Sequence, residues 1–394
     1  MASYIIGYTV IAVIILFVVF SVLVKKRILF GETVAVQKIF GHPLLHYSIR
    51  RVGSSLVSIA LAIIVTFFLI RLAYPADETC IQLFASQSSP TSSELFKLKC
   101  QNWKEQMGFN GSMIEQLINF FYNILPFPKT VCKTELETIE ATGEYVTKVF
   151  DCRNFVINFG SVYKIPGIAN GSFAIDYIGP RMMTSFKIGI IAVVLELALG
   201  YPFGIMMARY QNGIFDKIGK TYIMTIDAIP GVAYYYIWMA ILCGLFALPK
   251  VFESGDFSSW LPLILTMGFT GMSGIGLWVR RYMVDEFNAD YVKFARSKGL
   301  EEGRIMRIHI LRNAVVPLVR TFPSAVIGAL MGSYYLEKIY NVNGIGGALL
   351  VAINTKNASL LIAIIIISAL LSVISYLLGD IVTAIVDPRI SFTK

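Results

Sequence analysis

Charged residues are scarce in this chain. Asp, Glu, Lys and Arg make up only 15% of its 394 residues, whereas hydrophobic residues make up 56%. A soluble protein of this length would expose far more charge, so the composition excludes an ordinary globular protein. The mean hydropathy of +0.67 points the same way. We therefore expect an all-α, multi-pass membrane protein, with room for six or seven spanning helices of about 20 residues and one sizeable loop.

Residues that bind metals or catalyse reactions are few as well. The chain has only three histidines, His42, His46 and His309, and no Cys or carboxylate joins them at the spacing of metal ligands. His42 and His46 lie four residues apart, but two ligands make a poor metal site. No Ser/His/Asp arrangement can be assigned either. We expect neither a metal site nor a catalytic residue, so the chain is not an enzyme by itself.

One stretch nearly matches a nucleotide-binding loop, but the spacing of its two glycines is wrong. Residues 213–221 read Gly-Ile-Phe-Asp-Lys-Ile-Gly-Lys-Thr, with five residues between the two glycines, where the nucleotide loop has four. The stretch also follows an apolar run and not a buried strand, so no nest of backbone amides would form. We expect no nucleotide or other cofactor to bind this chain.

Long apolar runs, in contrast, are abundant. Each is near the length needed to cross a bilayer. Seven stand out, at residues 4–24, 52–72, 182–208, 222–248, 260–279, 314–336 and 359–386. The first has about 20 apolar residues, which is longer than the apolar core of a signal peptide, and its cations follow it instead of preceding it. We interpret it as a retained helix.

The net charge of +9 arises mainly from loops between these runs. In a soluble protein such a charge would suggest nucleic acid, but Lys and Arg also accumulate in the short cytoplasmic loops that set membrane topology. Basic residues gather in 25–51, 209–221 and 280–313, which lie on one side if all the runs span the membrane. The positive-inside rule makes that side cytoplasmic. We expect the N-terminus outside, the C-terminus in the cytoplasm, and no nucleic-acid partner.

The long segment 73–181 then faces outward, and it holds four of the five cysteines. An even number of cysteines on the oxidising side indicates a disulfide framework, for which three pairings are possible. Two of the cysteines are symmetric about residue 142, so a hairpin that turns there would bring them face to face. Four free thiols are the alternative. The expected pairs are Cys80–Cys100 and Cys132–Cys152.

Two carboxylates, Glu196 and Asp227, fall within apolar runs. Ionisable residues inside a membrane commonly mark a polar pathway, so both are candidates for a translocation path, where they would meet a substrate amino group. The alternative is that each pairs with a neighbouring helix. Glycines also recur at short steps from Gly268 to Gly276, which predicts close helix packing in lipid.

The most specific pattern is the polar, basic, helix-prone stretch Asp290–Pro317, which apolar runs flank on both sides. It begins Asp-Tyr-Val-Lys-Phe-Ala-Arg-Ser-Lys-Gly-Leu and ends Leu-Arg-Asn-Ala-Val-Val-Pro. In this it resembles the cytoplasmic loop of importers driven by ATP-binding cassettes, in the variant typical of oligopeptide and dipeptide permeases. The residues that match at the family's spacing are Asp290, Tyr291, Val292, Ala295, Arg296, Lys298, Gly299, Leu300, His309, Arg312, Asn313, Ala314 and Pro317.

The resemblance implies that this stretch docks on a cytoplasmic ATPase subunit. We expect Asp290 to cap the N-terminus of a short helix and Gly299 to end it. An apolar face of the helix would lie in a groove of the ATPase. A solvated basic loop that only sets topology is the alternative, but it leaves the apolar residues unexplained. The expected apolar face is Tyr291, Phe294, Ala295 and Leu300, and the other expected coupling residues are Arg296, Lys298, His309, Arg312, Asn313 and Pro317.

Shorter stretches resemble the same family elsewhere. Residues 198–204 are similar to a Gly-x-Pro-x-Gly turn in the second core helix, and residues 337–346 to an outer hairpin that begins with Glu337. Asp380 and residues 387–389 match the family's ending. The resemblance implies an extra transmembrane helix with its cytoplasmic linker (1–46), the first core helix (47–72), an extracytoplasmic domain (73–181) and the six-helix permease core completed by 182–394, with the coupling loop at 280–313.

The resemblance therefore implies the permease subunit of a bacterial oligopeptide importer in the cytoplasmic membrane. Its expected partners are a second, related permease, a pair of cytoplasmic ATPase subunits, an extracytoplasmic peptide-binding protein and membrane lipid. ATP and Mg would bind to the ATPases. The alternatives are import of another solute, such as a dipeptide or nickel, on the same frame, a secondary transporter without ATPases, or a membrane scaffold that acts through its external disulfide domain.

Overall fold

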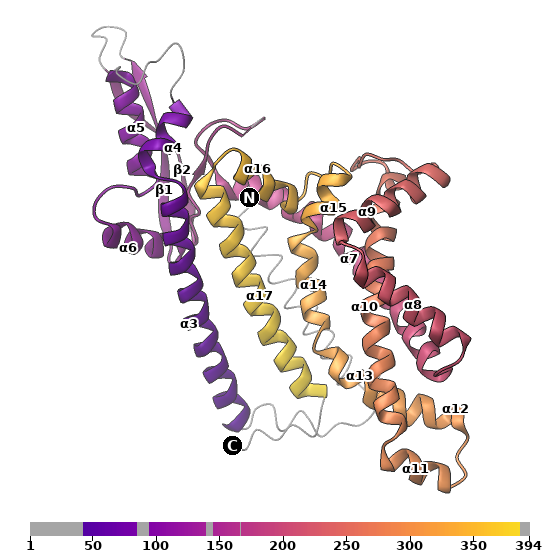
Figure 1. Cartoon of the computed structure of the whole chain (residues 1–394). Coiled ribbons are helices and arrows are strands. Elements are labelled where there is room, and N and C mark those ends of the chain that lie inside the picture. The colour runs from indigo at the N-terminus through magenta and orange to yellow at the C-terminus, as the bar shows by residue number, and fades with distance from the viewer. Residues whose placement is uncertain (1–41, 85–93, 139–144, 166, 387–394) are drawn as a thin grey trace. The chain divides into compact units, whose positions relative to one another are not determined.

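The structure is a computed structural model that describes residues 42–84, 94–138, 145–165 and 167–386 (Figure 1). The first apolar run, 4–24, and the ending 387–389 lie outside the described residues. The described chain forms two compact units. The first contains Leu56–Arg181 and Ala348–Leu370, and the second contains residues 42–55, Met182–Gly347 and the part of the chain from Leu371 onward.

The first unit joins helices to a hairpin. Helix α3 is followed by α4 after a bend of 59°, where Pro75 disfavours helical backbone in the residue before it. The buried Cys80 of α4 is bonded to Cys100 of α5. The elements are α3 (His42–Ala73, from residue 56), α4 (Ala76–Phe84), α5 (Glu94–Gln106), α6 (Met113–Ile124), β1 (Lys129–Thr138), β2 (Tyr145–Phe155), β3 (Ser161–Val162), β4 (Ser172–Phe173) and parts of α7, α16 and α17.

Strands β1 and β2 form the antiparallel hairpin that the cysteine spacing predicts. Cys132 lies opposite Cys152 and is bonded to it. The register is not constant along the ribbon, however, because it shifts by one residue between Cys132 and Lys133. Asp151 is the extra residue of this bulge, and its φ of 47° is left-handed. The expected symmetry about residue 142 therefore holds only on the side of the disulfide away from the turn.

The second unit is helical throughout its described part. Its elements are α7 (Ala174–Arg209, from residue 182), α8 (Ile214–Ala228), α9 (Gly231–Met239), a π-helical turn (Ala240–Leu245), a 3₁₀ turn (Phe257–Trp260), α10 (Leu261–Phe287), α11 (Asp290–Ser297), α12 (Glu302–Arg304), the π-helical turn η3 (Ile305–Ile310), α13 (Leu311–Val319), α14 (Phe322–Met331), α15 (Tyr334–Ile339), the start of α16 (Ile345–Asn354) and the end of α17 (Ala358–Val386).

Helices α7 and α10 pack closely through glycines, as the small residues predict. A Cβ on Gly268 would lie 2.5 Å from Leu195, and one on Gly204 would lie 2.6 Å from the carbonyl oxygen of Gly276. Gly274 is an exception, since nothing lies within 4 Å of such an atom. The expected turn at residues 198–204 was wrong, because α7 continues through that stretch without a break.

Two of the expected spans are broken. Three helices are long and apolar enough to cross a membrane, or up to six if each bent pair is one span, among the described residues. The run 222–248 is not one straight helix, because α8 and α9 meet at 112°. Ile229, the residue before Pro230, takes the extended backbone that a following proline favours. The run 314–336 bends by 41°, where Pro323 starts the new helix α14.

Candidate functional site

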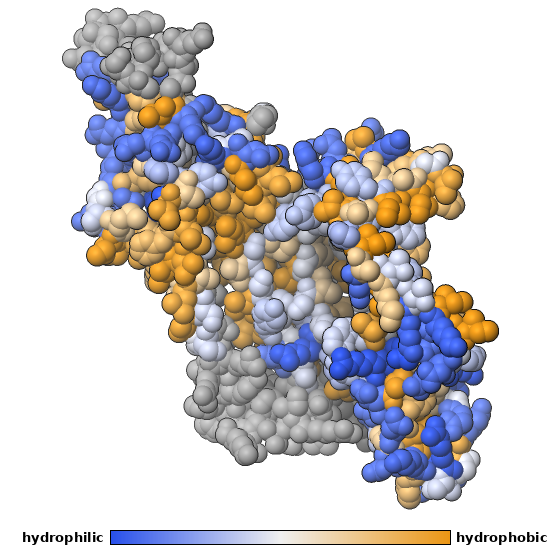
Figure 2. Space-filling model, viewed as in Figure 1, coloured by the Kyte–Doolittle hydropathy of each residue, from blue (hydrophilic) through white to orange (hydrophobic). Residues whose placement is uncertain are grey.

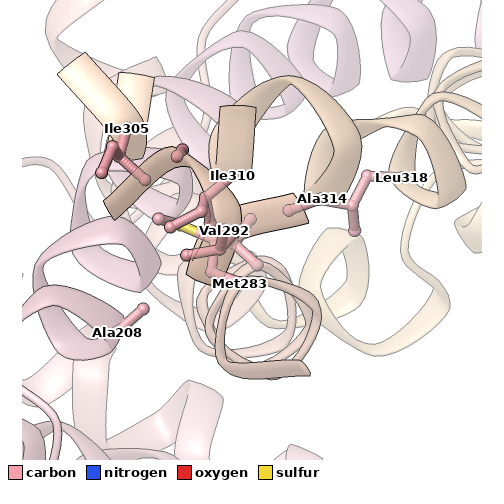
Figure 3. Close-up of a cluster of buried hydrophobic side chains, with 9 residues drawn as sticks. Ala208, Met283, Val292, Ile305, Ile310, Ala314 and Leu318 are labelled. Atoms are coloured by element: carbon pink, nitrogen blue, oxygen red, sulfur yellow. The ribbon is translucent and has the colours of Figure 1, made fainter. Parts of the chain in front are cut away.

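The stretch 290–317 is built around a cluster of buried apolar side chains, which we call the coupling cluster (Figure 3). Helix α11 contributes Val292 and Ala295, whose three-residue spacing puts them on one face. Val292 has no exposed surface and Ala295 is 5% exposed. The cluster comprises Ala208 of α7, Val279 and Met283 of α10, Val292 and Ala295 of α11, Ile305 and Ile310 of η3, and Ala314 and Leu318 of α13.

The N-terminus of α11 differs from the expectation. Ala289, and not Asp290, is the N-cap residue, and no side chain caps this end. Asp290 is the first helical residue and lies 2.9 Å from the ammonium of Lys293. This ion pair lowers the pKa of the Asp290 carboxyl below its ordinary value. A carboxylate in the first helical turn still complements the helix dipole, although it does not cap the helix.

The C-terminus of α11 agrees with the expectation for Gly299. Its φ of +72° is left-handed, a conformation that glycine adopts without steric cost. The amide of Leu300 donates to the carbonyl of Ala295 at 3.3 Å, and the amide of Gly299 to that of Arg296 at 2.9 Å. These two bonds are the Schellman motif. The chain therefore turns sharply after α11, which brings Leu300 back onto the coupling cluster.

The expected apolar docking face of α11 is divided between two sides of the helix. Ala295 faces the chain's own core, and Tyr291 and Leu300 also pack against the coupling cluster. Phe294 points the other way and is 60% exposed, with the Lys298 ammonium 4.3 Å from its ring centroid. In the structure Tyr291, Ala295 and Leu300 therefore contact the chain's own core, and of the four expected docking residues Phe294 is the one that is mainly exposed.

Other expected coupling residues lie around the same cluster. The Tyr291 hydroxyl bonds to Glu286 of α10 and donates to the carbonyl of His309 at 3.4 Å. Arg296 forms an ion pair with Glu302 at 2.6 Å, which raises the pKa of its guanidinium. Further along, α13 carries the exposed Arg312, the half-buried Asn313 and, inside the helix, the exposed Pro317.

A buried ion pair beside this region was not expected. Asp216 has no exposed surface, and Arg280 of α10 reaches its two carboxylate oxygens at 2.6 and 2.9 Å. Lys220 and the backbone amide of Asn212 also bond to it, at 2.9 and 2.8 Å. Asp216 and Lys220 belong to the stretch that nearly spells a nucleotide loop. Their four-residue spacing was visible in the sequence, but nothing in it indicated Arg280.

The structure places the two candidate pathway carboxylates on different helices. Glu196 of α7 lies against the backbone of Gly271 in α10, where a Cβ would be 2.1 Å from its Cδ. Asp227 is exposed in the last turn of α8, just before the break at Pro230. In the described part of the chain, neither forms an ion pair, and no group of three or more His, Cys, Asp or Glu side chains could hold a metal.

A second buried carboxylate, that of Glu337, was also not predicted from the sequence. Glu337 of α15 is 4% exposed, and its oxygens accept bonds from the Ser185 hydroxyl at 2.6 Å and the Gly346 amide at 2.8 Å. Ser185 in turn accepts from the amide of Ile345 at 2.9 Å. A Cβ on Gly344 would lie 2.3 Å from Glu337. The outer hairpin that begins at Glu337 is therefore tied to α7 through the first residues of α16.

Comparison with known proteins shows the family of this chain. The family model described as "Binding-protein-dependent transport system inner membrane component" matches residues 200–392. The dipeptide transport system permease protein DppB of Lactococcus lactis is 31% identical over 236 residues, covering 60% of this chain and 77% of the relative. This chain belongs to that family. The resemblance to oligopeptide and dipeptide permeases is confirmed.

Other relatives differ in how much they share. The oligopeptide transport system permease protein AmiC of Streptococcus pneumoniae is 37% identical over 223 residues, which cover 56% of this chain and only 45% of AmiC. The metal-staphylopine import system permease protein CntB of Staphylococcus aureus is 25% identical, over 84% of this chain and 94% of CntB. A solved structure of the MetNI methionine ABC transporter overlaps with a TM-score of 0.42 at 15% identity, covering 54% of this chain and 97% of that one.

Proposed function

We propose that this chain is a permease subunit of an ATP-driven importer of oligopeptides. It spans the cytoplasmic membrane with a second, related permease and receives peptide from an extracytoplasmic binding protein. A pair of cytoplasmic ATPase subunits binds ATP and Mg. The relatives from S. pneumoniae and L. lactis are oligopeptide and dipeptide transport permeases, which supports peptide as the cargo.

The observation that carries the proposal is the two-sided construction of α11. Its inner side is fixed by Val292 and Ala295 in the coupling cluster, while Phe294 and Lys298 remain outside. An exposed aromatic ring beside a cation on a rigid helix suits an apolar groove with an acidic rim. Phe294 therefore docks into the ATPase subunit, and Lys298 faces acids at the edge of the groove.

The coupling cluster explains how docking moves the membrane helices. It joins α11 to α10 and α13 through side chains that are at most 7% exposed. Packed interiors transmit a displacement and do not deform continuously. When ATP binding closes the ATPase dimer, α11 carries α10 and α13 with it, and the permease passes between inward-open and outward-open states.

The topology follows from the basic loops. The stretch 280–313 lies in the cytoplasm with the C-terminus, and the disulfide-bonded stretch 73–181 lies outside with the N-terminus. Glu196 and Asp227 serve the translocation path, where a carboxylate can meet the amino group of a peptide.

Reconstituted uptake tests the proposal. Complexes of this permease, its partner permease, the ATPases and the binding protein import labelled oligopeptide into liposomes in the presence of ATP. Phe294→Asp abolishes uptake and leaves the melting temperature of the permease without its ATPases unchanged, because Phe294 is exposed in this chain alone. Asn288→Asp, an exposed change of equal charge near α11, retains uptake. Normal uptake by Phe294→Asp contradicts docking, uptake without ATP indicates a secondary transporter, and an intact complex without any uptake indicates a scaffold.

A further inference from the structure

Helix α6 has more apolar surface than it buries. One side, with Phe120, Phe121 and the buried Ile124, packs against Ile63 of α3 and Ile366 of α17. All of these residues belong to the first compact unit. This side contains only some of the apolar residues of α6.

Other apolar residues of α6 are exposed. Ile114, Ile118 and Tyr122 follow one another at four-residue steps, so they form one stripe along the helix. They are 71%, 61% and 56% exposed, and Leu125 (44%) and Phe127 (57%) continue the stripe past the helix end. We call these five residues the α6 stripe. Exposing them to water costs roughly 25 cal/mol per Å² of apolar surface, so a nonpolar environment is favoured.

The position of α6 along α3 indicates what that environment is. The rings of Phe120 and Phe67 are 5.3 Å apart, and Phe67 lies six residues before the end of α3 at Ala73, which is about 9 Å along the helix. Figure 1 draws α6 beside this part of α3. Helix α6 therefore lies next to a segment that belongs to a candidate membrane span, Ala60–Ala73 with Ala76–Gln82.

Helix α3 has an exposed apolar stripe of its own on the same part of the chain. Leu61, Val65 and Leu69 are 58%, 55% and 60% exposed. Figure 2 shows hydrophobic surface running from α6 onto α3 without a hydrophilic band between them. An exposed apolar stripe on a candidate membrane span is suited to lipid, and the surface of α6 that is continuous with it is suited to the same environment.

Both ends of α6 are closed by side chains. Ser112 and Glu115 form a reciprocal capping box at the N-terminus. At the other end, the ammonium of Lys129 donates to the carbonyls of Asn123 and Leu125 at 2.9 and 3.1 Å. Burial lowers the pKa of Lys129. A helix end beside lipid needs such partners, because no water is available there for its free carbonyl groups.

From these observations we infer that α6 is an interfacial helix, with the α6 stripe immersed in the bilayer leaflet next to the Ala73 end of α3. Glu115 and Asn119, which border the stripe on its exposed side, face the lipid headgroups. An amphipathic helix in this position buries its apolar face by about 5–10 Å. The inference goes beyond peptide transport, since it gives the external region a lipid partner that does not depend on the cargo.

Spin-label accessibility tests this inference on the full chain in its assembled complex, in nanodiscs of phosphatidylethanolamine and phosphatidylglycerol. Nitroxides are attached to Ile114→Cys and Ile118→Cys, and to the matched controls Glu115→Cys and Asn119→Cys. Cys243, the free cysteine of the described chain, is buried, so the unsubstituted chain measures the background. Collision with oxygen, which concentrates in lipid, is compared with collision with a water-soluble nickel chelate.

The expected result is a several-fold higher ratio of oxygen to nickel accessibility at 114 and 118 than at 115 and 119. Equal nickel accessibility at all four positions overturns the inference, because the stripe then lies in water. Shielding of 114 and 118 from both reagents overturns it as well, because a protein then covers the stripe.

Discussion

The coupling cluster and the disulfide-bonded stretch 73–181 are held together in different ways. In the first, nine buried side chains from five elements form one continuous cluster, and no described disulfide is involved. In the second, two disulfides, small separate clusters and side-chain caps on α6 hold short elements in place. A continuous core can transmit motion. A structure that is linked by disulfides and has little core mainly keeps its shape.

The family model covers one of these two parts of the chain and not the other. The family model covers residues 200–392, which include the whole coupling cluster but none of the disulfides. The coupling cluster is thus built from the part that this chain shares with its family. The disulfides belong to a part outside that match, where a small structure gains stability from covalent links because it cannot bury a large core.

The largest expected effect is a difference in thermal stability between substitutions on the buried and the exposed side of α11. Val292→Asp puts an unpaired charge into a site with no exposed surface, which we expect to cost about 3–5 kcal/mol. Phe294→Asp, two residues away on the exposed side, should leave the melting temperature of the permease purified without the ATPases unchanged. Equal loss of thermal stability in both variants would show that α11 is not two-sided.

The next largest expected effect is on the local stability of the disulfide-bonded hairpin of β1 and β2. Cys132→Ser with Cys152→Ser opens a loop of 20 residues, which we expect to remove about 3 kcal/mol of local stability. Limited proteolysis should then cut within 129–155, while hydrogen exchange in α10 and α13 stays as in the parent. Non-reducing peptide mapping of the parent checks the pairing itself, and crossed pairs or four alkylatable thiols would refute it.

A smaller effect is expected at the end of α11. Gly299→Ala has open space around the new methyl group, so its cost of about 1–2 kcal/mol comes from the left-handed backbone alone. Gly303→Ala, in the same segment but without a left-handed φ, should not destabilise the complex. Thermal unfolding of the two variants in detergent gives the comparison. A loss for Gly303→Ala equal to that for Gly299→Ala would rule out backbone strain as the cause.

The smallest effect is a pH dependence in the hairpin. Lys133 and Arg153 both bond to Asp151 at 3.0 Å and lower the pKa of its carboxyl. A carboxyl whose pKa is lower in the folded state stabilises that state above its ordinary pKa of about 3.9, and the stabilisation is lost as the pH falls through the lowered value. Amide exchange in β1 and β2, corrected for intrinsic rates, should show weaker protection at acid pH. Asp151→Asn should reduce this dependence, and an unchanged dependence in that variant would contradict the assignment.

Features that depend on local chemistry could be predicted from the sequence. The apolar runs anticipated the long helices α7, α10 and α17, and cysteine spacing anticipated the face-to-face pair at 132 and 152. Gly299 was found because a helix that must turn sharply favours glycine at that position. Each of these depends on a few neighbouring residues.

Features that depend on tertiary packing could not be predicted. Which side of α11 is buried is decided by contacts with Met283, Ile305 and Ile310, which belong to other helices and leave no signal within α11 itself. The buried partner of Asp216 lies 64 residues away at Arg280. The break before Pro230 had a local signal, since proline restricts the residue before it, but the uninterrupted apolar run hid it.

Photocrosslinking from α11 tests most directly whether this chain couples to an ATPase. A photoreactive phenylalanine analogue replaces Phe294, or as a control Val292, in the complete chain expressed with its partners. We expect a covalent adduct from position 294 whose mass spectrum contains peptides of the nucleotide-binding subunit, and no such adduct from position 292. If the 294 variant imports peptide but forms no adduct with that subunit, then Phe294 does not dock there and the central claim is wrong.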